Sequence, residues 1–213
     1  MMTTKEVDAR TLHLDRKAIL ELMGIPDQEP DEMTRALIGE MSDLLLATAR
    51  PKYCYQIVGK VDFRYGKIID DALREGDRFA VIVSTAGEEV DRLLHELRSR
   101  DIAKAFVADT IASEIAEATQ RTAIEELERN AREGEQLSNP YSPGYCGWAL
   151  TEQKKLFALF DEAPCGVRLN DSCLMLPIKS ISSVIAMGPR VVKAPYGCAI
   201  CTKTDCYKKR PTR

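Results

Sequence analysis

The chain has 213 residues, of which 45% are hydrophobic and 30% are charged, and its formal net charge is −3. This composition is typical of a soluble globular protein with one domain, or one domain with small additions. The negative net charge excludes a global basic field that would attract nucleic acid. Because no run of about 18 uncharged apolar residues predicts a membrane span and no apolar signal core follows the charged N-terminus, we expect a cytoplasmic protein.

The first elements predicted along the chain are an amphipathic helix and a short strand. Asp31 marks the start of the helix and Pro51 follows its end. Spacings of three and four predict one buried helix face, made of Met33, Leu37, Met41, Leu44 and Thr48. The next run, YCYQIVG, is rich in aromatic and β-branched residues and therefore predicts a strand.

A strand–turn–helix unit is the clearest local pattern. Residues 79–84, FAVIVS, predict a strand buried on both faces. Thr85 and Glu88 have capping-box spacing at the start of a helix over residues 89–100. Just before this unit, residues 67–75 predict a helix that ends at Gly76, a residue suited to the left-handed cap position.

A long segment that favours helix extends from residue 102 to about residue 137. Its first half has small residues that allow close packing around Ile111 and Ile115, and its second half is much more charged. Ile124 follows Ile115 by nine residues and so lies roughly opposite it on the helix. We therefore expect that the helix bends or that its later half emerges into solvent.

Residues 138–157, SNPYSPGYCGWALTEQKKLF, concentrate two prolines, two glycines, two tyrosines and the single tryptophan. Proline fixes φ and glycine permits a sharp reversal, so this is either a rigid platform for a flat heterocycle or a structural corner. A short helix with Thr151 as its N-cap is expected next. Three strand-like runs follow, CGVRL, SCLMLP and SISSVIAM.

The cysteines are concentrated in the last third of the chain. Cys198, Cys201 and Cys206 form a C-x2-C-x4-C pattern, whose C-x2-C spacing suits two thiolates that bind one metal. Cys173, Cys165 or Cys146 could supply a fourth ligand, and we take Cys173 as the candidate. Zinc and an iron–sulfur cluster both fit this chemistry, and three reduced thiols are the alternative.

Four sequence blocks occur in a characteristic order over roughly residues 60–190: FAVIVSTAGEEVDRLLHEL, VADTIASEIAEA, SPGYCGWALTEQKKLFALFD and CGVRLNDSCLMLPIKSISSVIAM. In this order they resemble the activation domain of vitamin B12-dependent methionine synthase. The resemblance implies an α/β (α+β) fold with a twisted, largely antiparallel central sheet flanked by helices. It divides the chain into an N-terminal helical extension (1–55), the activation-domain-like domain (56–192) and a cysteine-rich tail (193–213).

The resemblance also implies a site. Ser142, Pro143, Gly144 and Tyr145 match the ligand-holding turn of the family. Ser113, Glu114 and Glu117 lie in the helix whose family counterpart contributes an acidic residue. One position departs from the pattern, because the family's turn begins with an arginine where this chain has Pro140.

The function implied is binding of S-adenosylmethionine for reductive remethylation of cob(II)alamin. The expected protein is a component of a methyltransferase system, acting in trans on a separate methionine synthase core or another corrinoid protein that presents cobalamin. A flavodoxin- or ferredoxin-like donor would supply the electron. The alternative is an iron–sulfur or zinc-binding redox or docking protein of corrinoid metabolism that has lost S-adenosylmethionine binding.

Overall fold

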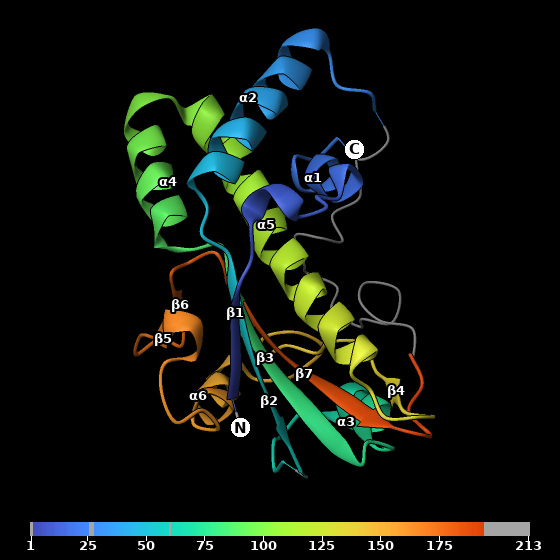
Figure 1. Ribbon diagram of the computed structural model, residues 1–213. Coiled ribbons are helices and arrows are strands. Elements are labelled where there is room, and N and C mark those ends of the chain that lie inside the picture. Colours follow the sequence, from blue (N-terminus) through green and yellow to red (C-terminus); the bar gives the residue numbers. More distant parts are fainter. Residues whose placement is uncertain (1, 26–27, 60, 194–213) are drawn as a thin grey trace.

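The computed structural model describes residues 2–25, 28–59 and 61–193 (Figure 1). The strands are β1 (Met2–Glu6), β2 (Lys52–Val58), β3 (Arg78–Thr85), β4 (Gln136–Leu137), β5 (Arg168–Leu169), β6 (Met175–Leu176) and β7 (Ser180–Gly188). The α-helices are α1 (Arg16–Leu22), α2 (Glu32–Thr48), α3 (Lys67–Leu73), α4 (Glu88–Arg100), α5 (Ile102–Arg129) and α6 (Gln153–Phe157). Short 3-10 helices are η1 (Ala9–Thr11), η2 (Leu150–Glu152) and η3 (Pro164–Gly166).

In the described part of the chain, five strands form an antiparallel sheet in the order β1-β2-β3-β7-β4. The apolar run predicted to be buried, β3, lies at the centre, with Lys52 of β2 opposite Thr85 and Met187 of β7 opposite Arg78. The predicted mixed α/β fold with a largely antiparallel sheet is therefore confirmed. The last three strand-like runs also form strands, β5 and β6 as a separate hairpin and β7 in the main sheet.

The sheet is covered on both faces because side chains of a strand alternate in direction. Val81 and Val83 point into a core with Leu73 of α3 and Leu156 of α6. Ile82, between the two valines, points to the other face, where α5 lies. Buried side chains on this second face include Ala80, Ala123, Leu127, Ile185 and Met187.

Helix α5 packs against different partners along its length (Figure 1). Its first half packs against α1, α2 and α4, and Ile111 and Ile115 lie in that core. Its second half covers the sheet through Ala123 and Leu127, and Ile124 is partly buried there. The later half therefore does not emerge into solvent. The buried side shifts around the helix because the first half packs against helices and the second against strands.

The N-terminal residues contribute both a strand to the sheet and helices that pack on α5. Strand β1 pairs with β2, from Met2 opposite Gln56 to Glu6 opposite Lys52, while α2 packs on α5. Asp31 caps α2 as expected, because its carboxylate accepts from the N–H of Thr34 at 2.7 Å. The predicted buried face is confirmed at Met41, but Met33 at its start is 82% exposed and Leu45 is buried in place of Leu44.

Three local predictions are wrong. Gly76 does not adopt a left-handed conformation, and a Cβ there would lie 2.8 Å from the Cβ of Ala186, so glycine is required by close packing. Thr85 lies in β3, and Gly87 (φ 100°) is the N-cap of α4 without a side-chain cap. Thr151 lies inside η2, so it does not cap α6.

Candidate functional site

The predicted ligand-holding turn begins at the outer edge of β7. After β4, the chain continues along this strand, where the Ser138 N–H donates to Ala186 O at 2.9 Å. Tyr141 and Val184 exchange two backbone hydrogen bonds, at 3.0 and 2.8 Å. The residue that follows, Ser142, therefore starts the turn from a fixed point on the sheet.

Within the turn, the backbone is held by its own hydrogen bonds. The Gly144 N–H donates to Trp148 O at 2.8 Å, and the Trp148 N–H donates to Tyr145 O at 2.9 Å. Gly144 has φ 92°, a conformation that residues with a side chain rarely adopt. Pro143 is buried, whereas Tyr145 is 50% exposed. The turn therefore presents a tyrosine at the surface on a rigid backbone.

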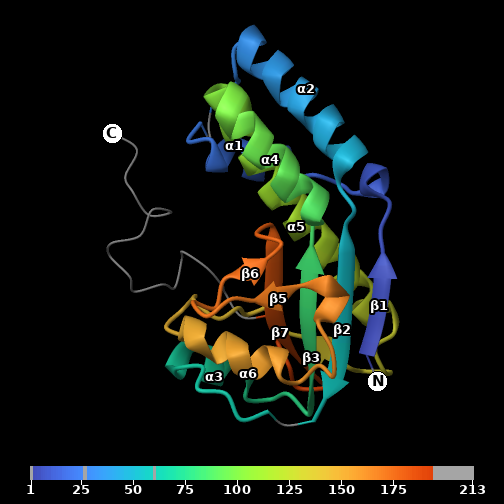
Figure 2. The same cartoon turned by 90° about the vertical axis from the view of Figure 1, so that its left-hand side faces the viewer.

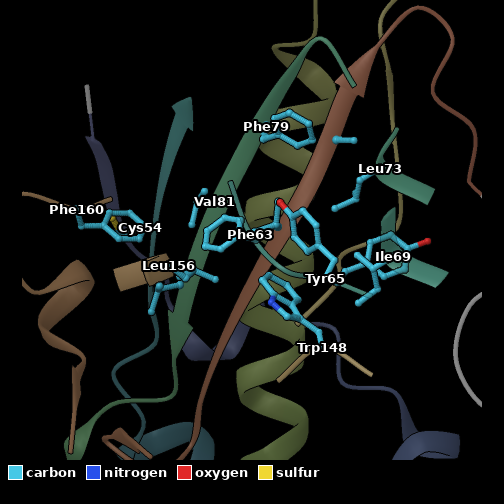
Figure 3. Close-up of a cluster of buried hydrophobic side chains, with 14 of the residues drawn as sticks. Cys54, Phe63, Tyr65, Ile69, Leu73, Phe79, Val81, Trp148, Leu156 and Phe160 are labelled. Carbon is cyan, nitrogen blue, oxygen red and sulfur yellow. The ribbon is translucent and has the colours of Figure 1, made fainter. Parts of the chain in front are cut away.

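An aromatic cluster packs around Trp148, the residue that closes this turn (Figure 3). Trp148 is buried and meets the ring of Tyr65 at a centroid distance of 4.7 Å and that of Phe63 at 5.4 Å, both edge to face. The Arg64 N–H donates to Glu152 Oε2 at 3.1 Å. A hydrogen bond from Lys155 and, as the smaller cause, this bond from Arg64 lower the pKa of Glu152. The loop before α3 thus fixes the segment that follows the turn.

The three candidate residues of α5 have different environments. The Ser113 hydroxyl donates to Asp109 O and accepts from Lys179 Nζ at 2.9 Å. The Glu114 carboxylate is buried and accepts from the Asp15 N–H at 2.8 Å and from Arg121 at 2.6 Å. Ser113 and Glu114 are therefore bonded to other parts of the chain. Glu117 lies on an exposed position of the same helix.

Helix α5 and the segment that leads into the turn contact neighbouring residues of β7. Gln120, almost one helical turn after Glu117, accepts from the Ser183 hydroxyl at 3.3 Å. Ser183 is next to Val184, which pairs with Tyr141. Helix α5, through Gln120, and the segment that leads into the turn, through Tyr141, therefore contact adjacent residues of one strand. Sequence reasoning could not distinguish Glu117 from Glu114, because one partner of Glu114, Asp15, is 99 residues away in the chain.

The predicted metal ligands are tested only in part. Cys198, Cys201 and Cys206 lie outside the described residues, so their role stays a prediction. Cys173 is buried, and within residues 2–25, 28–59 and 61–193 no three His, Cys, Asp or Glu side chains are grouped to bind a metal. Burial raises the pKa of the Cys165 thiol to about 12, and this thiol contacts Val83 O at 3.6 Å. A protonated thiol is a poor metal ligand.

A pocket that the sequence did not predict lies where β1 and β3 end and β2 begins. It has a volume of about 630 Å³, and its walls come from the end of β1, the start of β2, the β3–α4 connection, η3 and the β5–β6 hairpin. Cys165 and Gly166 lie on one wall and Gly87 on another. Because five separate segments form it, only the tertiary structure could reveal it.

Comparison with solved structures identifies the fold. The chain is similar to the crystal structure of the MetH reactivation domain bound to AdoHcy, with a TM-score of 0.70 and 17% sequence identity, over 92% of this chain and 80% of that chain. The antiparallel sheet crossed by one long helix is therefore the fold of a reactivation domain. A comparison with curated proteins found no significant match.

The family follows from a second comparison. The family model described as vitamin B12 dependent methionine synthase, activation domain, matches residues 66–210. This match covers more than half of the chain, so the protein belongs to this family. In the described residues, no helix is long and apolar enough to cross a membrane.

Proposed function

We propose that this protein binds S-adenosylmethionine through the turn formed by Ser142, Pro143, Gly144 and Tyr145, and that it serves the reductive remethylation of cob(II)alamin held by another protein. The observation that carries the proposal is the rigid turn itself, in which Gly144 has φ 92° and Tyr145 is 50% exposed. Membership of the activation-domain family supports it. So does the likeness in fold to a domain whose structure contains AdoHcy.

The residues at the turn fit such a ligand. Tyr145 offers an exposed aromatic face for a flat adenine and a hydroxyl for hydrogen bonding. Gly144 allows close approach because it has no side chain. Glu117 supplies a negative charge that suits a sulfonium or an ammonium group. The turn lacks an arginine, since residue 140 is proline, so we expect weaker binding of the ligand carboxylate than a bidentate pair would give.

The methyl donor, the partner's cobalamin and the turn each have a separate role in this proposal. S-adenosylmethionine supplies the methyl group, and the partner's cobalamin, after gaining one electron from a flavodoxin- or ferredoxin-like donor, accepts it. The turn holds and orients the methyl donor. The protein is then one component of a methyltransferase system that acts in trans on a methionine synthase core or another corrinoid protein.

A calorimetric titration tests the binding step. Wild-type protein titrated with S-adenosylhomocysteine should release heat that fits one site. Tyr145→Ala should weaken binding by about tenfold or more, because a stacked and hydrogen-bonded aromatic contributes on the order of 1–3 kcal/mol. Phe106→Ala is the matched control, since Phe106 is 52% exposed on α5 and outside the turn. Absence of heat from the wild type would reject the proposal.

The iron–sulfur or zinc alternative stays a prediction about Cys198, Cys201 and Cys206. A protein purified without oxygen that is brown and absorbs near 400 nm would support a cluster on these residues. Loss of the colour in a Cys198→Ser variant would assign it to the tail. A colourless, metal-free preparation would leave the three thiols without that role.

A further inference from the structure

The pocket of about 630 Å³ has one apolar wall, which includes Val7, Pro51, Cys165, Leu176 and Pro177. Burial raises the pKa of the Cys165 thiol to about 12, so the thiol stays neutral and acts as a small apolar group. Figure 2 shows the β5–β6 hairpin, which supplies Leu176, in front of the sheet and below α4. A cavity of this size holds a drug-sized ligand, larger than one free amino acid. A ligand with apolar side chains therefore fits this wall.

A second wall, at the start of α4, is acidic. Glu88 and Glu89 share one cation, because Arg92 pairs with their carboxylates at 3.3 and 3.2 Å. Asp91 accepts from the Ile178 N–H through Oδ2 at 2.6 Å, while its Oδ1 is buried and has no hydrogen-bond partner among the described residues. The partial positive charge of the helix start offsets only part of this charge. The wall therefore carries surplus negative charge.

A third wall carries an arginine that is not engaged. Arg168 lies in β5, opposite Leu176 of β6, and is exposed to the pocket. In the part of the chain that the structure describes, its guanidinium has no hydrogen-bond or ion-pair partner. By contrast, Lys52 pairs with Glu6 at 2.6 Å, and Arg50 donates to Ala49 O at the end of α2 at 2.8 Å. Arg168 is therefore available for an anionic group of a ligand.

These three walls exclude several classes of ligand. A phosphate compound would be repelled by the acidic start of α4. A bound metal ion is not indicated, since no three His, Cys, Asp or Glu side chains of the described residues are grouped to bind one. A wholly apolar compound would leave the charged walls unpaired. A ligand with an anionic group, a cationic group and apolar parts between them complements all three walls.

We propose that this pocket binds a short zwitterionic peptide of two or three residues with apolar side chains. Its carboxylate pairs with Arg168, its ammonium group lies at the acidic start of α4, and its side chains pack on the apolar wall. A guanidinium suits this role because it can bind a carboxylate with two parallel hydrogen bonds. The peptide site goes beyond the proposed function, because none of the turn residues 142–145 lines the pocket.

Calorimetric titration with four probes tests the two charged contacts. The probes are L-leucyl-L-leucine, its N-acetyl derivative, its C-terminal amide and free L-leucine. The unmodified dipeptide should bind at one site. The acetylated and amidated forms should each bind about tenfold more weakly or worse, because each lacks one charged group. Free L-leucine should also bind more weakly, since it fills less of the apolar wall.

Variants assign each charge of the peptide to a wall. Arg168→Gln should weaken binding of the dipeptide by about tenfold and leave binding of the amide unchanged. Glu88→Gln/Glu89→Gln should weaken binding of the dipeptide and leave binding of the acetylated form unchanged. Arg100→Gln and Glu96→Gln, at exposed positions of α4 outside the pocket, are the matched controls and should bind like the wild type. An unchanged thermal unfolding midpoint shows that each variant is folded.

Several results would overturn the proposal. They are wild-type protein that releases no heat with the dipeptide, an acetylated form that binds as tightly as the dipeptide, and an Arg168→Gln variant that binds like the wild type. Free L-leucine that binds as tightly as the dipeptide would assign the pocket to an amino acid instead. Competition between the dipeptide and S-adenosylhomocysteine would also overturn it, because both would then share one site. Failure of the proposed function is separate, since it would appear as a lack of S-adenosylhomocysteine binding while the dipeptide still binds.

Discussion

Glu126 is a buried carboxylate that connects three elements. It accepts from Lys5 Nζ of β1 at 2.5 Å, from the Tyr53 hydroxyl of β2 at 2.6 Å and from the Tyr55 hydroxyl at 3.0 Å. Burial disfavours its charge, but these hydrogen bonds outweigh that cost and lower the pKa of Glu126. The same carboxylate and burial raise the pKa of Tyr53, with burial as the larger cause. The edge of the sheet is therefore tied to α5 through one ionised residue.

This network predicts a pH dependence of stability. The folded-state pKa of Glu126 lies below its ordinary value of 4.5, so its stabilising effect is complete above that pH and is lost as the pH falls through the folded-state pKa. Glu126→Gln should lower the free energy of unfolding by about 2 kcal/mol at pH 7. Its deficit relative to the wild type should shrink below pH 4.5. Urea unfolding from pH 3 to 7 measures this, with Glu125→Gln, an exposed neighbour, as the control.

At the scale of elements, the connection between α3 and β3 depends on a close contact. A Cβ on Gly76 would lie 2.8 Å from the Cβ of Ala186 in β7 and 3.0 Å from the ring of Phe79. The turn after α3 therefore presses directly on the end of the sheet. The glycine is needed for space here, and a left-handed backbone plays no part.

Alanine substitutions at Gly76 and Gly39 test whether lack of space is the reason that residue 76 must be glycine. Gly76→Ala should lower the free energy of unfolding by about 2 kcal/mol, because the added methyl group overpacks a rigid contact. Gly39→Ala, inside α2 with open space around it, should raise the free energy of unfolding by about 0.5–1 kcal/mol, as expected for a helix interior. Thermal unfolding of both variants measures the difference. Equal effects would contradict the packing argument.

At the scale of the whole molecule, α5 connects the helical layer to the sheet. Its residue Glu114 binds the start of α1 through the Asp15 N–H, and Arg121 joins the same carboxylate and also donates to His13 O at 3.0 Å. The N-terminal segment is thus anchored to the helix that also carries Glu117.

Removal of Arg121 tests this anchor. Arg121→Ala would leave the buried Glu114 carboxylate without its cation, so the free energy of unfolding should fall by about 3 kcal/mol. Hydrogen exchange should show lower protection in residues 8–22. Arg129→Ala, an exposed arginine of the same helix, should change stability by less than about 0.5 kcal/mol. Unchanged protection in Arg121→Ala would show that other contacts hold the N-terminal segment.

Much of the fold could be predicted from local patterns. The apolar run of β3, the helical spacing of α2 and the three runs that became β5, β6 and β7 were recognised from residue type and period alone. The family was indicated separately, by the resemblance of four ordered sequence blocks to known motifs of the activation domain. Patterns of this kind depend on neighbours within one or two turns, which the chain itself specifies.

Burial of individual side chains was decided by contacts between distant segments. Glu114 and Glu117 look alike in the sequence, but the fold buries Glu114, which accepts from the Asp15 N–H and from Arg121, and leaves Glu117 exposed. Gly76 looked like a helix cap, but Ala186, more than a hundred residues later, sets its requirement. The pocket of about 630 Å³ likewise exists only where five segments meet. A linear pattern carries a residue's type and period, whereas its exposure and ion pairs depend on which distant residues the fold brings next to it.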